Sequence, residues 1–318
     1  MRSIDSADSA ASILRIGTRG SALALRQTEI VRDLILNAHP SCAISKRVVT
    51  TQGDAVQNCN LHEIGGQGVF VRELDNAILR GEVDCAVHSM KDIPSIRPKG
   101  VTTIAVLPRD PPYDFLAHSC TEDMIRIIGT SSTRRKAQML RYCSESGFFM
   151  HPITVSPLRG NVDTRLLRMR NGEYDAVMLA EAGLVRLGYQ VPGRRLQPDH
   201  FVPSPNQGTI AIVCRDDETT ECEGLHSLLA SLHDPESGMD TAIERIVMEE
   251  IGGGCFTPQG IYCNHGHLTA EVLSLDGTQC ERITEHVSSL EQAREIGQEL
   301  QKQALPLIKA ARLELKIP

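Results

Sequence analysis

Short apolar runs alternate with amphipathic stretches along most of this chain. Residues 13–18 predict a strand, and Ser21 can cap a helix that runs to about His39. This alternation is typical of βαβ units, in which a helix returns the chain to the next strand of a parallel or mixed sheet. The sequence therefore predicts an α/β fold.

The same alternation continues as far as residue 179. Further strands are predicted over residues 47–51, 83–87, 125–129 and 175–179, and further helices over 69–79, 132–142 and 161–170. A polar, glycine-rich loop is predicted over residues 52–68. Beyond Pro235 the pattern changes to a helix, a glycine-rich turn, short strands over 260–275 and a long helix over 289–313. We expect this last part to form a third, smaller domain.

Two local similarities indicate an internal repeat. Ile-Gly-Thr at residues 16–18 recurs at 128–130, each time at the end of a predicted strand. Gly-Glu-Val-Asp at 81–84 recurs as Gly-Glu-Tyr-Asp at 172–175, each time between a predicted helix and a strand. Glycine followed by an acid is also ordinary turn chemistry, so a duplication and a coincidence both stay open. A duplication would place two α/β domains face to face, with a ligand between the carboxyl ends of their strands.

Composition limits the partners of the chain. Its 318 residues are enough for two or three domains. Aromatic residues make up 3% with no tryptophan, which argues against a stacking platform for single-stranded nucleic acid. A formal net charge of -7 argues against binding a polyanion through overall charge. We therefore expect no nucleic-acid partner.

The cysteines and the amino-terminal segment predict the cellular location. The ten cysteines lack paired spacing and are interpreted as reduced thiols of a cytoplasmic protein. Residues 1–12 lack the apolar stretch of a secretory signal and the arginine-rich character of a transit peptide. No apolar run approaches membrane-spanning length, so we expect no membrane association.

Arginines gather where predicted strands end and helices begin, at Arg19, Arg134, Arg135, Arg159, Arg165 and Arg186. Several have serine, threonine or glycine neighbours, and a helix N-terminus adds unpaired N–H groups and a positive dipole end. Taken singly, each arginine could be a solvated charge or an ion-pair partner. Six in comparable positions favour a cleft for a ligand with several anionic groups. Because no Walker-type glycine loop is present, carboxylates are favoured over a nucleotide.

The segment His88-Ser89-Met90-Lys91-Asp92 follows the strand predicted over residues 83–87. An acid at the carboxyl edge of a parallel strand points into the cleft where ligands bind. Asp92 could stabilise a developing cation or pass a proton to a leaving amine. Alternatively, Asp92 could be the N-cap of a helix that begins at Ile93, and the local sequence leaves both possibilities open.

Three glycines, residues 252–254, precede Cys255. They indicate a turn that presents the thiol instead of burying it, which suits covalent attachment or nucleophilic catalysis. A zinc site of Cys255, Cys263, His265 and His267 is an alternative, although the chain has no Cys-x-x-Cys pair. A buried, inert Cys255 is the third possibility.

Residues 244–260, which contain this glycine run, resemble the cofactor-attachment signature of the porphobilinogen deaminase family, in which a cysteine carries a dipyrromethane through a thioether. Residues 88–94 resemble the catalytic-aspartate segment of that family. Residues 130–135, 158–165, 182–186 and 207–208 match further family segments in order. The resemblance covers the chain from about Leu14 to its end, and the motifs around Cys255 and Asp92 are highly specific.

The resemblance implies a three-domain α/β fold. Two doubly wound domains, similar to periplasmic binding proteins, would face each other across a cleft, and a smaller α/β domain would follow. The expected bounds are residues 12–107 with 208–226 for the first domain, 108–207 for the second and 227–318 for the third.

The resemblance also implies the activity. Members of the family, also called hydroxymethylbilane synthases, condense four porphobilinogen molecules into linear hydroxymethylbilane and release ammonia, in haem and chlorophyll synthesis. Asp92 would assist the loss of ammonia, giving an azafulvene-type electrophile that the free α-carbon of the bound chain attacks. Water would then release the product from the permanent dipyrromethane, which is itself made from substrate. The product would pass to uroporphyrinogen-III synthase, and we expect a cytoplasmic monomer.

The matching segments imply which residues form the site. Asp92 would be the catalytic residue, and Cys255 would hold the dipyrromethane covalently. The other cofactor-binding residues would be Ser89, Lys91, Asp92, Thr130, Ser132, Arg134, Arg135, Gly160 and Gln207. The substrate-binding residues would be Arg19, Ser21, Gln27, Arg159, Arg165 and Arg186. No metal is implied.

Three places depart from the usual family pattern. Gln259 stands where an apolar residue is general, and Ser-Pro-Asn at 204–206 replaces a more typical Ala-Val-Gly. Glu63 and Gln67 stand in the predicted loop where many members have lysines, so we expect a mobile flap with a weaker electrostatic grip on the growing chain. The catalytic and cofactor positions are otherwise complete, so we expect an active enzyme.

Two other classes of protein compete with this interpretation. An anion-binding module of the periplasmic type would explain the arginines but not an exposed Cys255. A cysteine-dependent hydrolase would explain Cys255, but no histidine stands in a recognisable partnering motif.

Overall fold

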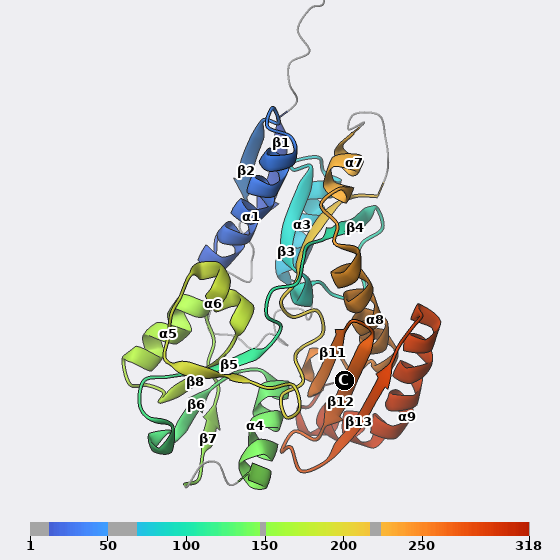
Figure 1. The fold of residues 1–318 in the computed structure, drawn as a ribbon. Helices are drawn as coiled ribbons and strands as arrows, with labels where there is room; N and C mark the ends of the chain where they lie inside the picture. The colour runs from blue at the N-terminus through green and yellow to red at the C-terminus, as the bar shows by residue number, and fades with distance from the viewer. Residues whose placement is uncertain (1–12, 50–68, 147–150, 217–223, 318) are drawn as a thin grey trace, which may run out of the picture.

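The computed structural model describes residues 13–49, 69–146, 151–216 and 224–317. The described chain forms three β-sheets, each with helices packed on it (Figure 1). In that view the first sheet lies at the top, the second at the lower left and the third at the lower right. The predicted loop over 52–68, with Glu63 and Gln67, lies outside the described residues. None of the described helices is long and apolar enough to span a membrane.

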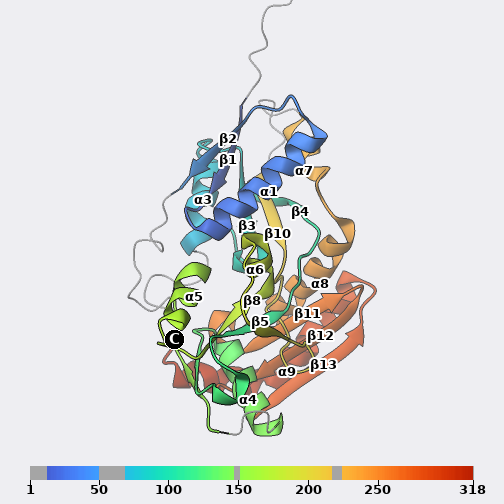
Figure 2. The ribbon, with the colours of Figure 1, turned by 60° about the vertical axis from the view of Figure 1, so that its left-hand side comes forward.

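The first sheet has the strand order β2-β1-β3-β10-β4. Its strands are β1 (Leu14–Thr18), β2 (Ile44–Val48), β3 (Cys85–Ser89), β4 (Val101–Val106) and β10 (Ile210–Arg215). Helices cover both faces of the sheet (Figure 2). Buried aliphatic side chains pack between the sheet and these helices. One face carries α1 (Ala22–Ala38) and α7 (Leu225–Ala230), and the other carries α3 (Val69–Leu79).

The second sheet has the strand order β7-β6-β8-β5-β9. Its strands are β5 (Asp114–His118), β6 (Ile127–Gly129), β7 (Thr154–Ser156), β8 (Ala176–Ala180) and β9 (Gly193–Leu196). One face carries α4 (Thr133–Ser146), and the other carries α5 (Val162–Arg170) and α6 (Glu181–Leu187). A short 3₁₀ helix, η2 (Glu122–Met124), precedes β6.

These two sheets share one topology. In each, the second strand of the order pairs in parallel with both neighbours, and the fourth pairs antiparallel with the third. Asp84 and Asp175, which end the two copies of the repeated Gly-Glu-x-Asp motif, each accept a backbone N–H from the adjacent strand. The donors are the N–H of Arg15 at 2.7 Å and that of Ile127 at 2.8 Å. The predicted repeat therefore reflects a duplicated architecture.

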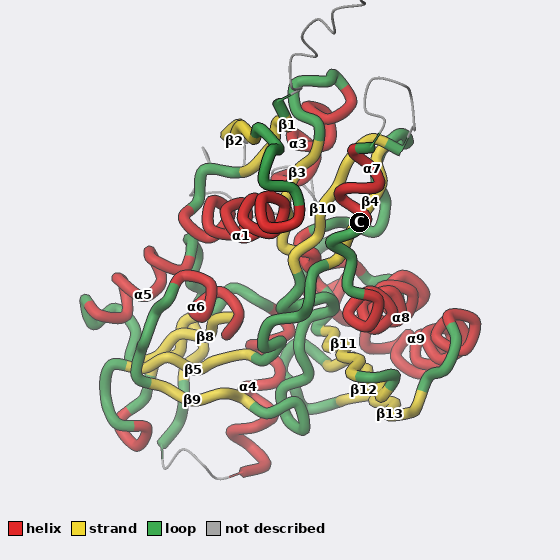
Figure 3. The backbone as a smooth tube through the Cα atoms, turned by 45° about the horizontal axis from the view of Figure 1, so that its top comes forward, coloured by secondary structure: helices red, strands yellow, loops and turns green. Residues whose placement is uncertain are grey.

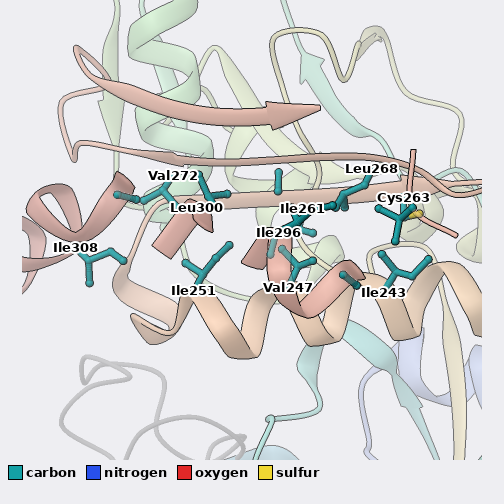
Figure 4. Packing of buried hydrophobic residues seen from close by; sticks show 14 of the residues in the cluster. Ile243, Val247, Ile251, Ile261, Cys263, Leu268, Val272, Ile296, Leu300 and Ile308 are labelled. Atoms are coloured by element: carbon teal, nitrogen blue, oxygen red, sulfur yellow. The ribbon is translucent and has the colours of Figure 1, made fainter. Parts of the chain in front are cut away.

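The third sheet is antiparallel, with the order β11-β12-β13. Its strands are β11 (Gln259–Asn264), β12 (His267–Leu273) and β13 (Cys280–His286). The long helices α8 (Pro235–Ile251) and α9 (Leu290–Glu314) pack on it through a cluster that includes Val247, Ile261 and Leu300 (Figure 4). Ser289 caps α9, accepting the N–H of Gln292 at 3.2 Å, so the predicted start of this helix is confirmed.

Three strands begin two or three residues away from their predicted starts, among them β6, which begins at Ile127 instead of 125. The structure has β2 at Ile44–Val48 instead of 47–51, and β3 at Cys85–Ser89 instead of 83–87. β2 is an edge strand whose last three residues are exposed, so no apolar alternation marks its bounds. Val83 is buried but belongs to the turn after α3, where its N–H reaches the carbonyl of Ala77.

Two segments, residues 107–113 and 197–209, join the first and second sheets, and we call them the crossover segments. Figure 3 shows them as loops that run between the two sheets and past the third. Asn206 in the second of them has a φ of 62°, a left-handed conformation that asparagine tolerates better than most residues. This accounts for an asparagine where glycine is more typical of the family. The exact bounds of the three domains stay a prediction.

Candidate active site

A pocket lies at the carboxyl ends of β1 and β3, against the first turns of α1. Its polar lining consists of Arg19, Ser21, Gln27, His88, Ser89 and Asp92, and all except His88 were predicted as site residues. They come from distant segments, but parallel β1 and β3 are neighbours and end at the same edge of the sheet. At ≈ 60 Å³ the pocket is well below the about 300–1,000 Å³ of ordinary small-molecule sites, so ligand entry must widen it.

Local hydrogen bonds hold this pocket together. Ser21 is the N-cap of α1 and accepts the N–H of Ala24 at 3.3 Å, as the sequence predicts. The Gln27 amide donates to the Ser89 hydroxyl at 2.9 Å and so ties α1 to the end of β3.

Asp92 is the last residue of a 3₁₀ helix, η1 (Met90–Asp92), that follows β3 directly. Ile93 continues in an extended conformation, so the alternative interpretation of Asp92 as a helix N-cap is wrong. The Asp92 side chain is exposed, and its carboxylate is therefore open to a ligand in the pocket.

Arg134 and Arg135 lie in the first turn of α4 and are both buried. They share the carboxylate of Asp114, the first residue of β5: Arg134 NH1 lies 2.6 Å from Oδ2, and Arg135 NH2 lies 2.8 Å from Oδ1. Burial opposes the charge of Asp114, but the two guanidinium groups prevail and hold the pKa of this carboxyl well below its usual range.

The Gln207 side chain links this ion cluster to Lys91. Its Nε2 donates to the carbonyl of Pro112 at 2.7 Å and to Asp114 Oδ1 at 2.9 Å. Its Oε1 accepts from Lys91 Nζ at 3.2 Å and from Arg135 at 3.4 Å. Burial, followed by the charge of Arg135, lowers the pKa of Lys91 to about 8.

Arg159 and Arg165 extend the positive charge of the cluster. Arg165 donates from Nε to the carbonyl of Gly160 at 2.8 Å, and burial and Arg135 lower its pKa to about 10. Lys91 and Arg165 form a cluster of five cations with their electrostatic neighbours Arg134, Arg135 and Arg159. The carboxylates among these neighbours are two, Asp92 and Asp114. This excess of positive charge fits a ligand that carries several carboxylates.

Thr130, Ser132 and Gly160 shape the turns around these cations. Thr130 Oγ1 accepts the N–H of Ser132 at 3.2 Å, and Ser132 Oγ accepts the N–H of Arg135 at 3.3 Å. Gly160 has a φ of 112°, which a residue with a Cβ rarely adopts. These three residues stand beside the predicted cofactor site, and their direct roles in binding stay a prediction.

Arg186 has a different environment from the other predicted arginines. It is buried, with Nε 2.7 Å from Asp110 Oδ2 and NH2 2.6 Å from the carbonyl of Gly208. It therefore joins α6 to both crossover segments. The backbone oxygen of Arg186 also accepts from Arg26 Nε at 3.3 Å, where α1 meets α6 (Figures 1 and 2).

The glycine run before Cys255 has the conformation that the sequence predicts. Gly252, Gly253 and Gly254 have φ values of 69°, 82° and 70°, all in the region that favours glycine. Cys255 then lies in a single 3₁₀ turn, η4 (Gly254–Phe256), and its side chain is outside the described part of the structure.

The alternative zinc site has no counterpart in the described part of the chain. Cys263 Sγ donates to Asp240 at 3.2 Å, and His265 Nδ1 lies 2.5 Å from Glu236. Among the described residues, no three histidine, cysteine or acidic side chains are placed to hold a metal ion.

Two residues of this region were missed at the level of sequence. Asp114 stands outside every motif, and the strand that it begins, β5, was not predicted either. His88 stood inside the segment that carries Asp92 but was given no role.

Fold and site together define a three-sheet α/β protein with a cation-rich site for a ligand bearing carboxylates. Residues 14–223 match the domain described as "Porphobilinogen deaminase, dipyromethane cofactor binding domain", and residues 240–306 match "Porphobilinogen deaminase, C-terminal domain". The chain belongs to the porphobilinogen deaminase family. The first of these descriptions also confirms the expected dipyrromethane cofactor.

Relatives cover nearly all of the chain. A Methanosarcina mazei protein named "Probable porphobilinogen deaminase" is 47% identical over 300 residues, which span 90% of each chain. A Syntrophobacter fumaroxidans protein named "Porphobilinogen deaminase" is 36% identical over 301 residues, 91% of this chain and 93% of that one. Among solved structures, a probable amino-acid-binding protein of a Bacillus subtilis transporter covers 70% of this chain and 90% of its own, with a TM-score of 0.40 and 9% identity.

Proposed function

We propose that this chain is a hydroxymethylbilane synthase whose reaction takes place between the pocket of Asp92 and the cation cluster around Asp114. It joins four porphobilinogen molecules into linear hydroxymethylbilane and releases ammonia. The observation that carries the proposal is the placement of exposed Asp92 between a pocket lined by Arg19 and a cluster of five cations. The family match over residues 14–223 supports it.

Asp92 is the catalytic residue in this proposal. Its carboxylate can accept the N–H of a pyrrole, stabilise positive charge that develops as ammonia departs, and pass a proton to the leaving amine. Its side chain is exposed at the end of η1 and so can contact a ligand that enters the pocket.

The cations hold the carboxylates of the ligands. Lys91, Arg134, Arg135 and the turns of Thr130, Ser132 and Gly160 would hold the dipyrromethane, with Gln207 orienting Lys91. When bound, the dipyrromethane supplies the nucleophilic pyrrole carbon to which substrate is added. Arg19, Ser21, Gln27, Arg159 and Arg165 would hold the acetate and propionate groups of substrate and growing chain. For Arg186 we propose an indirect role, because it joins α6 to both crossover segments and belongs neither to the lining of the Asp92 pocket nor to the cation cluster.

The attachment of the cofactor to Cys255 gives the decisive test. Intact-mass spectrometry of the untreated protein should show a discrete excess that peptide mapping assigns to Cys255. Cys255→Ala should lack both the added mass and the activity, while the matched control Cys120→Ala should keep both. An active preparation with an unmodified Cys255 thiol would overturn the proposal.

We extend the proposal to the surroundings of the enzyme. A cytoplasmic location is supported by the described cysteines, which are all free thiols. The enzyme would act as a monomer and pass its linear product to uroporphyrinogen-III synthase. Sedimentation of the holoenzyme at micromolar concentration tests the monomer, and dimeric mass would contradict it.

A further inference from the structure

His88 is a buried histidine in the wall of the pocket that contains Asp92. It is the fourth residue of β3 and its side chain is 5% exposed. Its Nε2 is fully buried and has no hydrogen-bond partner among the described residues. A buried polar atom without a partner carries a free-energy cost comparable with a lost hydrogen bond, so its presence in a pocket calls for an explanation.

The groups that face His88 keep its ring uncharged. Burial, followed by the positive charges of Arg97 and Arg19, lowers the pKa of His88 to about 3. On α3, the carboxylate of Asp75 forms a buried ion pair with Arg97. On the neighbouring strand β10, the residue opposite His88 is Ala211, which offers no polar side chain. His88 is therefore a neutral hydrogen-bonding group at physiological pH.

Three other polar side chains of the same pocket, Ser21, Gln27 and Ser89, form hydrogen bonds within the protein. Gln27 and Ser89 bond to each other, and Ser21 bonds to the N–H of Ala24. The Nε2 atom of His88 differs from them because the described protein provides nothing to bond with it. Buried groups that break a rule of packing in this way are expected at functional sites.

We propose that His88 is a further substrate-contacting residue, whose Nε2 forms a hydrogen bond with the carboxylate-bearing pyrrole that enters the pocket beside Asp92. The inference rests on the proposed function, since it takes the ligand of this pocket to be porphobilinogen. Entry of the substrate widens the pocket and gives the imidazole its missing partner. Because the ring is neutral, this contact differs from those of the arginines, and its contribution to binding should not depend on salt.

His88→Phe tests the proposal, because it keeps a ring of similar shape and removes the nitrogen. KM for porphobilinogen should rise roughly tenfold, with kcat little changed, since the contact is made in both the ground state and the transition state. The ratio of the two KM values should be the same at low and high salt. The melting temperature should stay level or rise, because an unpaired buried atom is removed. His88→Gln, which restores a polar atom, should recover part of the loss.

Gln259→Leu is the matched control. Its Oε1 is also buried without a partner among the described residues, but it lies on β11 in the third sheet. This variant should gain stability in the same way and leave KM unchanged. A His88→Phe protein with wild-type KM would overturn the proposal, and so would one that melts early with unchanged KM, which would mark a purely structural residue. If His88→Phe fails to fold, His88→Leu is measured against the same criteria.

Different measurements test the proposed function and the role of His88. Cofactor mass and tetrapyrrole formation in the wild-type protein test the former, whereas the KM of the His88 variants tests the latter. A full complement of attached cofactor in His88→Phe is expected, because the residue is assigned to incoming substrate.

Discussion

Arg109 and Glu244 form a buried ion pair, with NH1 2.6 Å from Oε1 and NH2 3.2 Å from Oε2. The Glu244 carboxylate also accepts the backbone N–H groups of Asn206 at 2.5 Å and Cys263 at 2.7 Å. Arg109 and Asn206 stand in the two crossover segments, while Glu244 comes from α8. One carboxylate from the third part of the chain therefore anchors both connections between the first two sheets.

Glu244→Gln should destabilise the protein by about 3–5 kcal/mol, because it leaves Arg109 buried without a counter-charge. Urea unfolding measures the change. The matched control Glu82→Gln removes an exposed pair with Arg80 and should leave the unfolding midpoint where it is. A stable Glu244→Gln protein would show that other contacts anchor the crossover segments.

Asp92→Asn should lower kcat by about 10²–10⁴-fold while the fold and the attached cofactor stay intact. The amide keeps the shape of the side chain but cannot relay a proton or stabilise a cation in the same way. Single-turnover assays together with the intact mass check this. Near-normal turnover would move the catalytic role to another residue.

Lys91 should lose its proton near pH 8, which is below the usual value for lysine of about 10.4. The unfolded chain binds more protons between these two values, so the contribution of Lys91 to stability rises with pH across that window. Conversely, binding of cofactor carboxylates should weaken as pH rises through 8, because the ammonium charge is lost. Cofactor incorporation into apoenzyme, measured by mass against pH, tests this. Lys91→Arg should remove the dependence, and an unchanged profile in that variant would contradict it.

Asp114→Asn should cost about 3–5 kcal/mol of stability at neutral pH, because Arg134 and Arg135 lose their shared carboxylate. The folded-state pKa of Asp114 is lowered, so its contribution is complete above the unfolded carboxyl value of about 3.9 and is lost as pH falls through the folded one. The difference in the free energy of unfolding between the wild type and Asp114→Asn should therefore disappear only in strong acid. Denaturation at several pH values tests this, with exposed Asp33→Asn as the neutral control.

The arginines should divide by stage of the reaction. Arg134→Leu should impair attachment of the cofactor, whereas Arg165→Leu should retain the cofactor and stall the growth of the chain. Arg134 pairs with Asp114 in the ion cluster that also acts on Lys91. Arg165 lies on α5, and the charges of Arg135 and Asp92 act on it. Mass spectra of holoenzyme and of its intermediates distinguish the two. Normal assembly in Arg134→Leu with slowed later steps would refute this division.

The sequence alone determined an α/β fold and many of its elements, because caps, glycines and alternation act over a few residues. It did not predict the strands β4, β5, β7, β9 and β10. Ser21 and Ser289 begin helices where expected, and three glycines before Cys255 adopt the left-handed conformations that their type predicts. The resemblance to a family then named Asp92 and the pocket residues around it, and the structure brings five of them together. The bounds predicted for the edge strand β2 were three residues too late, because its exposed residues carry no apolar pattern.

Only the tertiary structure decided which charges meet. Asp114 on β5 forms ion pairs with Arg134 and Arg135 on α4. Glu244 forms an ion pair with Arg109, which precedes it by 135 residues in the chain. Such pairings depend on how sheets and helices are packed, and no local periodicity encodes them. The same holds for His88. The sequence shows that His88 belongs to the segment of Asp92, but only the tertiary structure shows that its Nε2 is buried without a hydrogen-bond partner among the described residues. Local rules are short-range, whereas burial and ion pairing are properties of the assembled core.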